Sequence, residues 1–121
     1  MWAWVAVAGA SGAAARYAVH QLATSRTATA VPWGTIVVNV LGALALGVVV
    51  GLVVAHGVDR DVQTVVGTGF LGAFTTFSAF SYETFALVED GMGTTAVLHA
   101  IGSTVAGLAA AALGLALTGA L

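Results

Sequence analysis

The sequence has no cysteine and few charged side chains. Without cysteine it has no disulfide framework, no thiolate metal site and no thiol nucleophile. Only 7% of the 121 residues are charged, whereas 60% are hydrophobic, and the mean hydropathy is +1.04. This composition argues against a water-soluble fold. The three cations, all arginines, cannot form a basic surface, so nucleic acid is not an expected partner.

The N-terminus lacks the positively charged segment that begins a secretory signal peptide. It is apolar from the start, Met1-Trp-Ala-Trp-Val5. We therefore expect the first hydrophobic segment to be retained as a helix and the whole chain to be mature.

Four long apolar runs are separated by short polar interruptions. A bilayer core of roughly 30 Å needs about 20 apolar residues of helix, and backbone in lipid must satisfy its own hydrogen bonds. The runs are too long and too unpatterned for barrel strands. We expect an all-α membrane protein with a single domain, residues 1–121. Its four transmembrane helices are predicted at residues 2–23, 33–55, 62–88 and 94–117.

The third run is longer than a bilayer core requires. Residues 62–88 would form about 40 Å of continuous helix at 1.5 Å per residue. Its middle is rich in glycine and threonine, which are poor helix formers, so we expect a break there. Freed backbone groups at membrane depth need protein, water or an ion as partner, which makes the break a candidate ion site. The residues concerned are Gly67, Gly69, Gly72, Thr75 and Thr76.

Polar groups within apolar runs are the default functional candidates, because they are costly in hydrocarbon. Arg16 is either an anion-attracting group or an arginine that extends to the interface. Asn39 either lines a pathway or ties two helices together. Glu83 is the only acid within a run.

Two phenylalanines lie beside hydroxyl groups in the broken segment. Phe77 and Phe80 are three residues apart and share a helix face, as do Ser78 and Ser81 on a neighbouring stripe. Such a pair usually packs a core, but an aromatic ring edge is electropositive and can approach an anion.

Small residues recur at the spacing that lets helices approach closely. In the second run they are Gly47 and Gly51, and in the fourth Ser103, Gly107 and Ala111. We expect helix packing from these residues, with Ser103 also a functional candidate.

The loop arginines do not favour one orientation in the membrane. With four helices, Arg26 and Arg60 fall on opposite sides, so the positive-inside rule is balanced. Such a chain permits an antiparallel, dual-topology dimer.

Three segments resemble signatures of the bacterial CrcB/Fluc fluoride channels. They are Gly9-Ala-Ser-Gly-Ala-Ala-Ala-Arg16-Tyr17, Pro32-Trp-Gly-Thr35-Ile-Val-Val-Asn39-Val-Leu-Gly42, and Gly69-Phe-Leu-Gly72-Ala-Phe-Thr75-Thr76-Phe77-Ser78-Ala-Phe80-Ser81-Tyr-Glu83. The resemblance covers the first three helices in order, and the fourth matches around Ser103.

The resemblance implies a fluoride-selective channel in the bacterial cytoplasmic membrane that exports fluoride passively and lowers its toxicity. It implies an antiparallel dual-topology dimer, formed with a second copy or an oppositely oriented homologue, with fluoride pathways along the subunit interface. Phe77 and Phe80 would present ring edges to the anion. The other pathway positions implied are Thr35, Asn39, Ser103 and Arg16, with Ser78 and Ser81 as further hydroxyls.

The resemblance also implies a structural sodium ion at the dimer centre. Main-chain carbonyls of Gly72 and Thr75 would hold it. Carbonyl oxygens suit such a hard cation, and the ion would in turn satisfy acceptors freed by the break.

Two other classes of protein fit parts of the sequence. A small dual-topology multidrug/proton exporter needs an embedded carboxylate, typically in its first helix, and the only one here is Glu83 in the third. A non-transporting scaffold subunit would explain the glycine ridges but not the Thr-Ser-Phe cluster. An enzyme is not expected, because the histidines lie on separate segments and no serine sits in a nucleophile motif.

Overall fold

The computed structural model describes residues 1–27 and 29–121, and all regular structure in these residues is helical. Ala28, in the loop predicted between the first two helices, lies outside the described residues. The prediction of an all-α chain is confirmed, and four successive helical segments, with α3 to α5 forming the third, fit the expected architecture. In chain order the elements are α1 (Trp2–Ser25), α2 (Trp33–His56), α3 (Arg60–Val62), η1 (Gln63–Leu71), α4 (Gly72–Phe74), α5 (Phe77–Glu89) and α6 (Gly93–Leu117).

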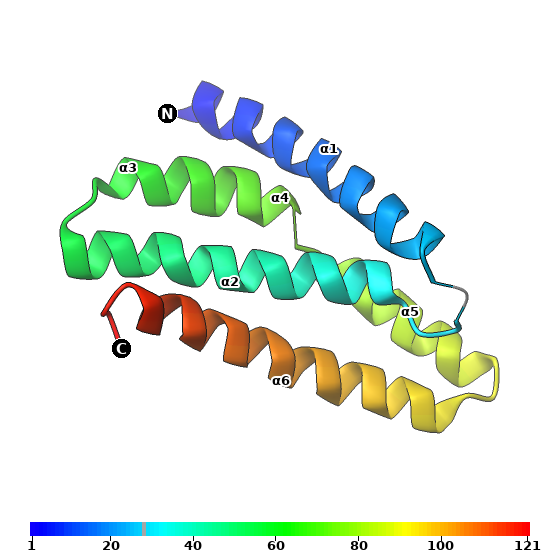
Figure 1. The fold of residues 1–121 in the computed structure, drawn as a ribbon. Helices are drawn as coiled ribbons and strands as arrows, with labels where there is room; N and C mark the ends of the chain where they lie inside the picture. The colour runs from blue at the N-terminus through cyan, green and yellow to red at the C-terminus, as the bar shows by residue number, and fades with distance from the viewer. Residues whose placement is uncertain (28) are drawn as a thin grey trace.

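Helix α2 is the central element of the bundle. It packs against α6 on one side and against η1 and α1 on the other (Figure 1). After α4 the chain changes direction, and α5 packs against α6. Both termini lie at one end of the bundle with the α2–α3 loop, and the α5–α6 turn lies at the opposite end (Figure 1).

The connection between α2 and α3 carries ordinary signals for the end of one helix and the start of the next. Gly57 ends α2 in the left-handed conformation, with φ at 66°, and its N–H donates to the carbonyl of Leu52. Asp59 caps α3 by accepting a hydrogen bond of 2.8 Å from the N–H of Asp61. Short, well-terminated connections therefore hold consecutive helices antiparallel.

The first half of the third segment is a π-helix, which the sequence analysis did not anticipate. This element, η1, packs closely against α1. A Cβ atom added at Gly12 of α1 would overlap the carbonyl of Phe70, and one added at Gly69 would lie 2.9 Å from Cβ of Ala8. The glycines let the wider helix and α1 approach to backbone contact.

The contact between α2 and α6 is made by glycine on both helices. A Cβ atom added at Gly47 would overlap the carbonyl of Ala111, and one added at Gly114 would lie 2.5 Å from the carbonyl of Leu44. Gly107, also expected to pack, has no atom of another helix within 4 Å of an added Cβ among the described residues. The close approach on α6 is therefore made by Gly114 rather than Gly107.

A matched pair of variants tests this crossing point. Alanine favours a helix over glycine by about 1 kcal/mol at either site. We expect Gly107→Ala to be neutral or stabilising, whereas Gly47→Ala should destabilise by about 1–3 kcal/mol because the added methyl group meets main chain. Thermal unfolding in detergent measures both effects, and equal midpoints for the two variants would contradict the assigned contact.

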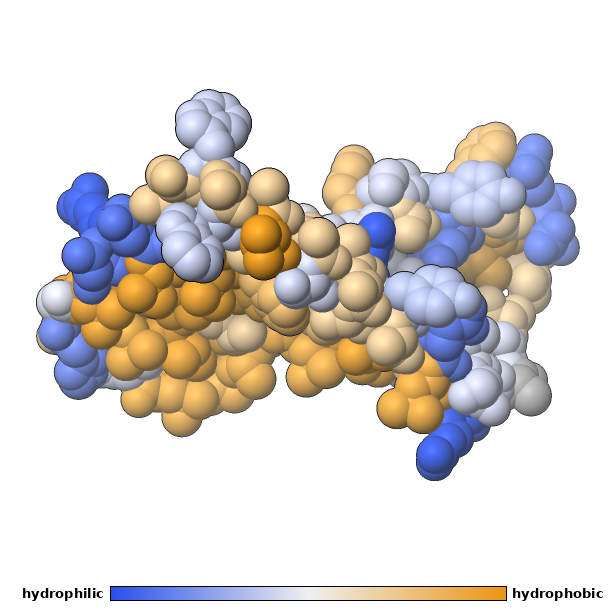
Figure 2. Space-filling model, turned by 90° about the horizontal axis from the view of Figure 1, so that it is seen from above, coloured by the Kyte–Doolittle hydropathy of each residue, from blue (hydrophilic) through white to orange (hydrophobic). Residues whose placement is uncertain are grey.

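Few side chains are buried within one chain, and many large apolar ones are exposed. The main buried cluster is Val38 of α2 with Leu71 and Phe74, whereas 24 large hydrophobic residues are exposed. In Figure 2 apolar residues cover much of the middle of the molecule, and hydrophilic residues gather at the two ends. Within the described residues, α2 and α6 are each long and apolar enough to cross a bilayer.

Candidate ion-binding site

The third helical segment leaves the helical conformation at Thr75 and Thr76. Thr75 has φ and ψ of −115° and 128°, and Thr76 has −131° and 110°, so both are extended. The Thr76 hydroxyl accepts a hydrogen bond of 3.1 Å from the N–H of Ala79 and thereby caps α5. The Thr75 hydroxyl donates back to the carbonyl of Leu71, at 3.0 Å. Each threonine therefore stabilises one side of the extended link.

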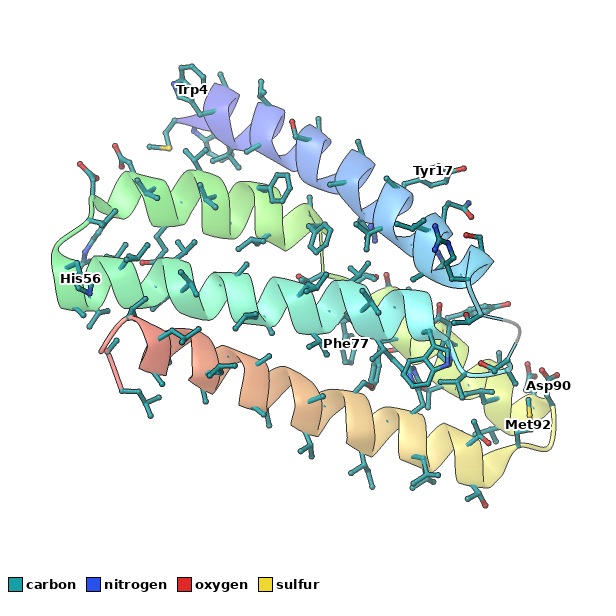
Figure 3. The ribbon with its side chains drawn as sticks, viewed as in Figure 1. Trp4, Tyr17, His56, Phe77, Asp90 and Met92 are labelled. Atoms are coloured by element: carbon teal, nitrogen blue, oxygen red, sulfur yellow. The ribbon has the colours of Figure 1, made fainter. Side chains whose placement is uncertain are left out.

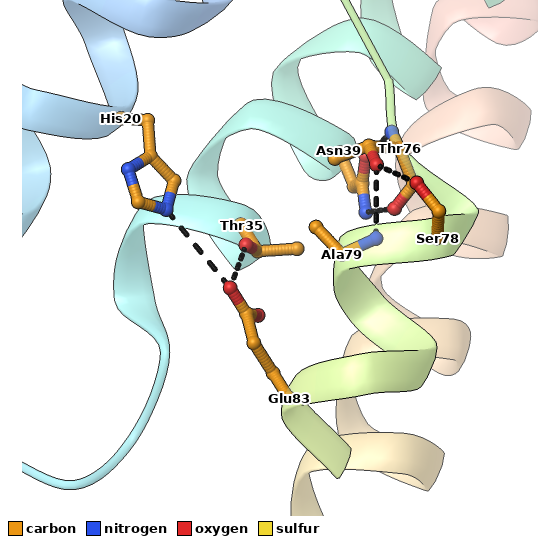
Figure 4. Close-up of polar contacts among 7 residues, drawn as sticks. All are labelled: His20, Thr35, Asn39, Thr76, Ser78, Ala79 and Glu83. Carbon is orange, nitrogen blue, oxygen red and sulfur yellow. Dashed lines mark hydrogen bonds and ion pairs between the residues drawn. The ribbon is translucent and has the colours of Figure 1, made fainter. Parts of the chain in front are cut away.

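Asn39 pairs with the main chain of this link. Its Oδ1 accepts a hydrogen bond of 2.7 Å from the N–H of Thr76, and its Nδ2 donates to the carbonyl of Thr76 at 3.2 Å (Figure 4). A single side chain on α2 thus satisfies both polar groups of a non-helical residue. The two sequence interpretations of Asn39 are not exclusive, because its side chain ties helices together and also lines the cavity described next.

A cavity of about 590 Å³ lies beside the extended link. It brings together eight residues that were candidates from the sequence, namely Asn39, Gly67, Gly72, Thr75, Thr76, Phe77, Phe80 and Ser103. Its remaining lining residues were not predicted: Gly42, Ala43, Leu46, Leu71 and Thr104. An apolar cavity with a few convergent polar groups is the usual form of a small-ligand site.

The two phenylalanines face this cavity together. Their ring centroids are 5.9 Å apart, with the ring planes inclined by 35°. Phe80 also lies against the His99 ring of α6, with centroids 5.2 Å apart, whereas 80% of Phe77 is exposed. Phe77 lies near the middle of the bundle, well away from His56 at one end and Asp90 at the other (Figure 3).

Both carbonyls expected to bind sodium lose their helical donors at the link. In a continuous helix the N–H of Thr76 would bond to Gly72, and the N–H of Ala79 would bond to Thr75. Here the first donates to Asn39 and the second to the Thr76 hydroxyl. In the described part of the chain no group of three His, Cys, Asp or Glu side chains could hold a metal ion. The freed carbonyls of Gly72 and Thr75 therefore fit a hard cation better than any side-chain cluster does.

Thr35 and Glu83 form a second polar group towards the α5–α6 turn. The Thr35 hydroxyl, in a residue only 1% exposed, donates to Oε1 of Glu83 at 2.8 Å (Figure 4). Nε2 of His20 on α1 lies 4.0 Å from the same carboxylate oxygen. Glu83 was a functional candidate from the sequence, as the only acid within a run, but it was not predicted as a pathway residue.

Three further predicted pathway residues, Ser78, Ser81 and Arg16, lie outside the cavity lining. Ser78 and Ser81 are exposed on α5, and the Ser78 hydroxyl is 3.1 Å from that of Thr76. Arg16 is half-buried on α1, and the cavity lining includes no residue of α1. Ser103 reaches the cavity, and its hydroxyl donates to the carbonyl of His99 on its own helix.

Irregular backbone at membrane depth is tolerated where it lines a cavity. A polar, non-helical link beside a cavity, surrounded by apolar helices, is therefore typical of a membrane transport protein. The chain belongs to the family described as CrcB-like protein, Camphor Resistance (CrcB), whose model matches residues 3–115.

Curated relatives are similar over nearly their whole length. A protein of Symbiobacterium thermophilum named fluoride-specific ion channel FluC 1 is 46% identical over 118 residues, which cover 96% of this chain and 95% of the relative. A fluoride-specific ion channel FluC of Novosphingobium aromaticivorans is 43% identical, with coverages of 95% and 93%. FluC 2 of Cutibacterium acnes is 44% identical, with coverages of 94% and 94%. The family resemblance inferred from the sequence is confirmed, and the chain is a membrane protein of this channel family.

Proposed function

We propose that the chain is a fluoride-selective channel that lets fluoride leave the cell passively across the cytoplasmic membrane. The observation that carries the proposal is the cavity in which Phe77, Phe80, Asn39 and Ser103 converge beside the extended link. Relatives that are more than 40% identical over nearly the same length and are named fluoride-specific ion channels support it.

The chemistry of this site suits a small, strongly hydrated anion. A pathway must replace the water of fluoride with hydrogen-bond donors or with electropositive ring edges. Asn39 has one amide hydrogen left after its bond to Thr76. The Thr76 hydroxyl accepts from the N–H of Ala79 and keeps its own hydrogen as a donor. None of these groups is a fixed positive charge, so an anion is bound weakly enough to leave again.

Growth of a fluoride-sensitive bacterium tests the proposal in a cell. A strain without its own fluoride exporter should resist fluoride when it expresses this chain, and should not gain resistance to chloride or to cationic drugs. Resistance to drugs without resistance to fluoride would instead support the multidrug exporter interpretation.

The functional unit of this proposal is an antiparallel dual-topology dimer, built from two copies or from this chain and an oppositely oriented homologue. In the described part of the chain the cavity is open and 24 large apolar side chains are exposed, and a partner chain would cover part of this surface. The loop arginines, Arg26 and Arg60, lie at opposite ends and balance.

A tag on the C-terminus should therefore be accessible from both sides of the membrane. Lysines added to the α2–α3 loop should fix one orientation and lower fluoride flux, because antiparallel partners become scarce. A single orientation of the unmodified chain in cells lacking any homologue would rule out the homodimer.

The proposed dimer holds a structural sodium ion through the carbonyls of Gly72 and Thr75. The ion would supply positive charge to acceptors that have lost their helical donors. Asn39 and the Thr76 hydroxyl accept the N–H groups that would otherwise bond to these carbonyls, so the carbonyls stay free for the ion.

Sodium removal should abolish flux reversibly. Replacing sodium on both sides by a large organic cation should stop fluoride release, and sodium should restore it. Thr75→Ser keeps the carbonyl and the hydroxyl, so this variant should show the same sodium dependence as wild type. Flux that persists after thorough sodium removal would exclude the ion from the mechanism.

A further inference from the structure

Glu83 is a carboxylate with few partners inside a membrane segment. Its Oε1 accepts a hydrogen bond of 2.8 Å from the Thr35 hydroxyl, and its Oε2 is buried without a hydrogen-bond partner among the described residues. One neutral hydroxyl does not compensate a negative charge, which is costly in surroundings of low dielectric constant. A group that can carry positive charge is therefore expected beside this carboxylate.

His20 of α1 meets this requirement. Its Nε2 lies 4.0 Å from Oε1 of Glu83, and this is the only ion-pair contact in the described part of the chain (Figure 4). The imidazole rests on α2 at Gly34, where an added Cβ atom would lie 2.7 Å from Cδ2 of His20. The ring therefore packs closely on main chain that a larger residue would cover, with Nε2 turned towards the carboxylate.

The Glu83 carboxylate lies between the larger cavity and one end of the bundle. Glu83 follows Phe80 by three residues on α5, and Thr35 precedes Asn39 by four on α2, so each lies about one turn beyond a residue of the larger cavity. Towards the α5–α6 turn, Glu83 and Asp90 line a smaller cavity of about 210 Å³. An anion that moves from the larger cavity towards this end therefore approaches the carboxylate.

We propose that protonated His20 neutralises Glu83 and thereby makes fluoride flux dependent on pH. The inference rests on the proposed channel function. With the imidazolium present, the pair has no net charge and the anion passes. When His20 loses its proton, Glu83 keeps an uncompensated negative charge beside the pathway and repels fluoride. His20 acts through Glu83 and does not have to touch the ion.

The other charged groups near His20 do not titrate in the same range. Helices α2 and α4 and the π-helix η1 pack against α1, and their one titratable residue, His56, is at the opposite end of α2 from Gly34. On α1 itself, Arg16 lies one turn before His20. Its guanidinium stays charged throughout the titration of a histidine.

The groups around Glu83 leave one histidine to be separated from His20. Tyr82 and Asp90 share the lining of the smaller cavity with Glu83. On α6, the His99 ring lies against Phe80, and its nitrogens have no hydrogen-bond partner among the described residues. Among these side chains, only an imidazole ordinarily changes its charge between about pH 5 and 8.

The test is fluoride release from liposomes between about pH 6 and 8, after subtraction of the release from protein-free liposomes. Wild-type flux should fall about three- to tenfold as pH rises. His20→Gln should show the low flux of wild type at high pH over the whole range. His20→Lys keeps a positive charge and should show high flux without a slope.

A double variant tests whether His20 acts through Glu83. Glu83→Gln can still accept the Thr35 hydrogen bond but carries no charge, so its flux should be independent of pH. Adding His20→Gln to Glu83→Gln should change nothing further, because no negative charge remains to be neutralised. Equal effects of His20→Gln in both backgrounds would overturn the proposal.

Two other histidine variants serve as controls. His56→Gln and His99→Gln should keep the wild-type slope, whatever their absolute flux. The proposal is overturned by pH-independent wild-type flux, or by a wild-type slope in His20→Gln. Should His20→Gln not fold, or Glu83→Gln release no fluoride, a wild-type slope in His20→Lys alone is sufficient to reject it. If wild type releases no fluoride at any pH, the proposed function itself fails.

Discussion

Replacing Phe80 by isoleucine is expected to reduce fluoride flux to the leak of protein-free liposomes while the protein still folds and assembles. Isoleucine keeps apolarity and much of the bulk but removes the electropositive ring edge. Phe80 lines the cavity and its ring lies against both Phe77 and His99, so the proposed channel has this ring in its pathway. Phe77→Ile should have the same effect on flux with less effect on stability, because 80% of Phe77 is exposed.

A third phenylalanine on the same helix provides the matched control. Phe85 is 60% exposed and does not line the cavity, so Phe85→Ile should leave flux unchanged. If Phe80 only packs against α6, its replacement should cost about 1 kcal/mol of stability and leave flux intact. Normal flux in both Phe77→Ile and Phe80→Ile would remove the ring-edge mechanism.

Asn39→Ala is expected to lower both stability and flux. The substitution leaves the N–H and the carbonyl of Thr76 without their partner. Each unsatisfied buried group costs about 1–3 kcal/mol, so we expect the free energy of unfolding to fall by about 2–4 kcal/mol. Without the Asn39 bonds the main chain of Thr76 is no longer held in place at the link, which would also disturb the proposed sodium site.

Thermal unfolding in detergent and fluoride release measure the two effects of Asn39→Ala. Gln21→Ala, which removes another amide at an exposed position of α1, serves as control and should be neutral in both assays. An Asn39→Ala protein with the wild-type unfolding midpoint and wild-type flux would show that the link does not depend on this side chain.

The helical segments could be predicted from the sequence because hydrophobicity and bilayer thickness leave few alternatives. Apolar runs of at least about 20 residues and short polar loops set both number and approximate ends. The π-helical geometry of η1 could not be predicted, since it follows from how Gly69 and Gly12 let the third segment approach α1. Residue spacing alone predicted a packing role for Gly107, whereas the structure has Gly114 at the contact with α2. Spacing could not distinguish them, because several glycines on α6 have suitable spacing.

Only part of the candidate site could be predicted from the sequence. Phe77, Phe80, Asn39 and Ser103 line one cavity, as expected of residues in segments that must pack together. The pairing of Asn39 with Thr76 and of Thr35 with Glu83 spans 37 and 48 residues of sequence, and no local pattern reports such long-range partners. Oε2 of Glu83 and the ring nitrogens of His99 are buried without a hydrogen-bond partner among the described residues, and this burial depends on helix packing that no local pattern reports.

The most direct test of the central claim uses purified protein in liposomes loaded with both fluoride and chloride. With an ionophore to balance charge, ion-selective electrodes follow the release of each anion. The proposed channel should release fluoride at once and retain chloride, with rates that differ by orders of magnitude. A folded, assembled protein that releases no fluoride, or releases chloride equally fast, would contradict the assignment.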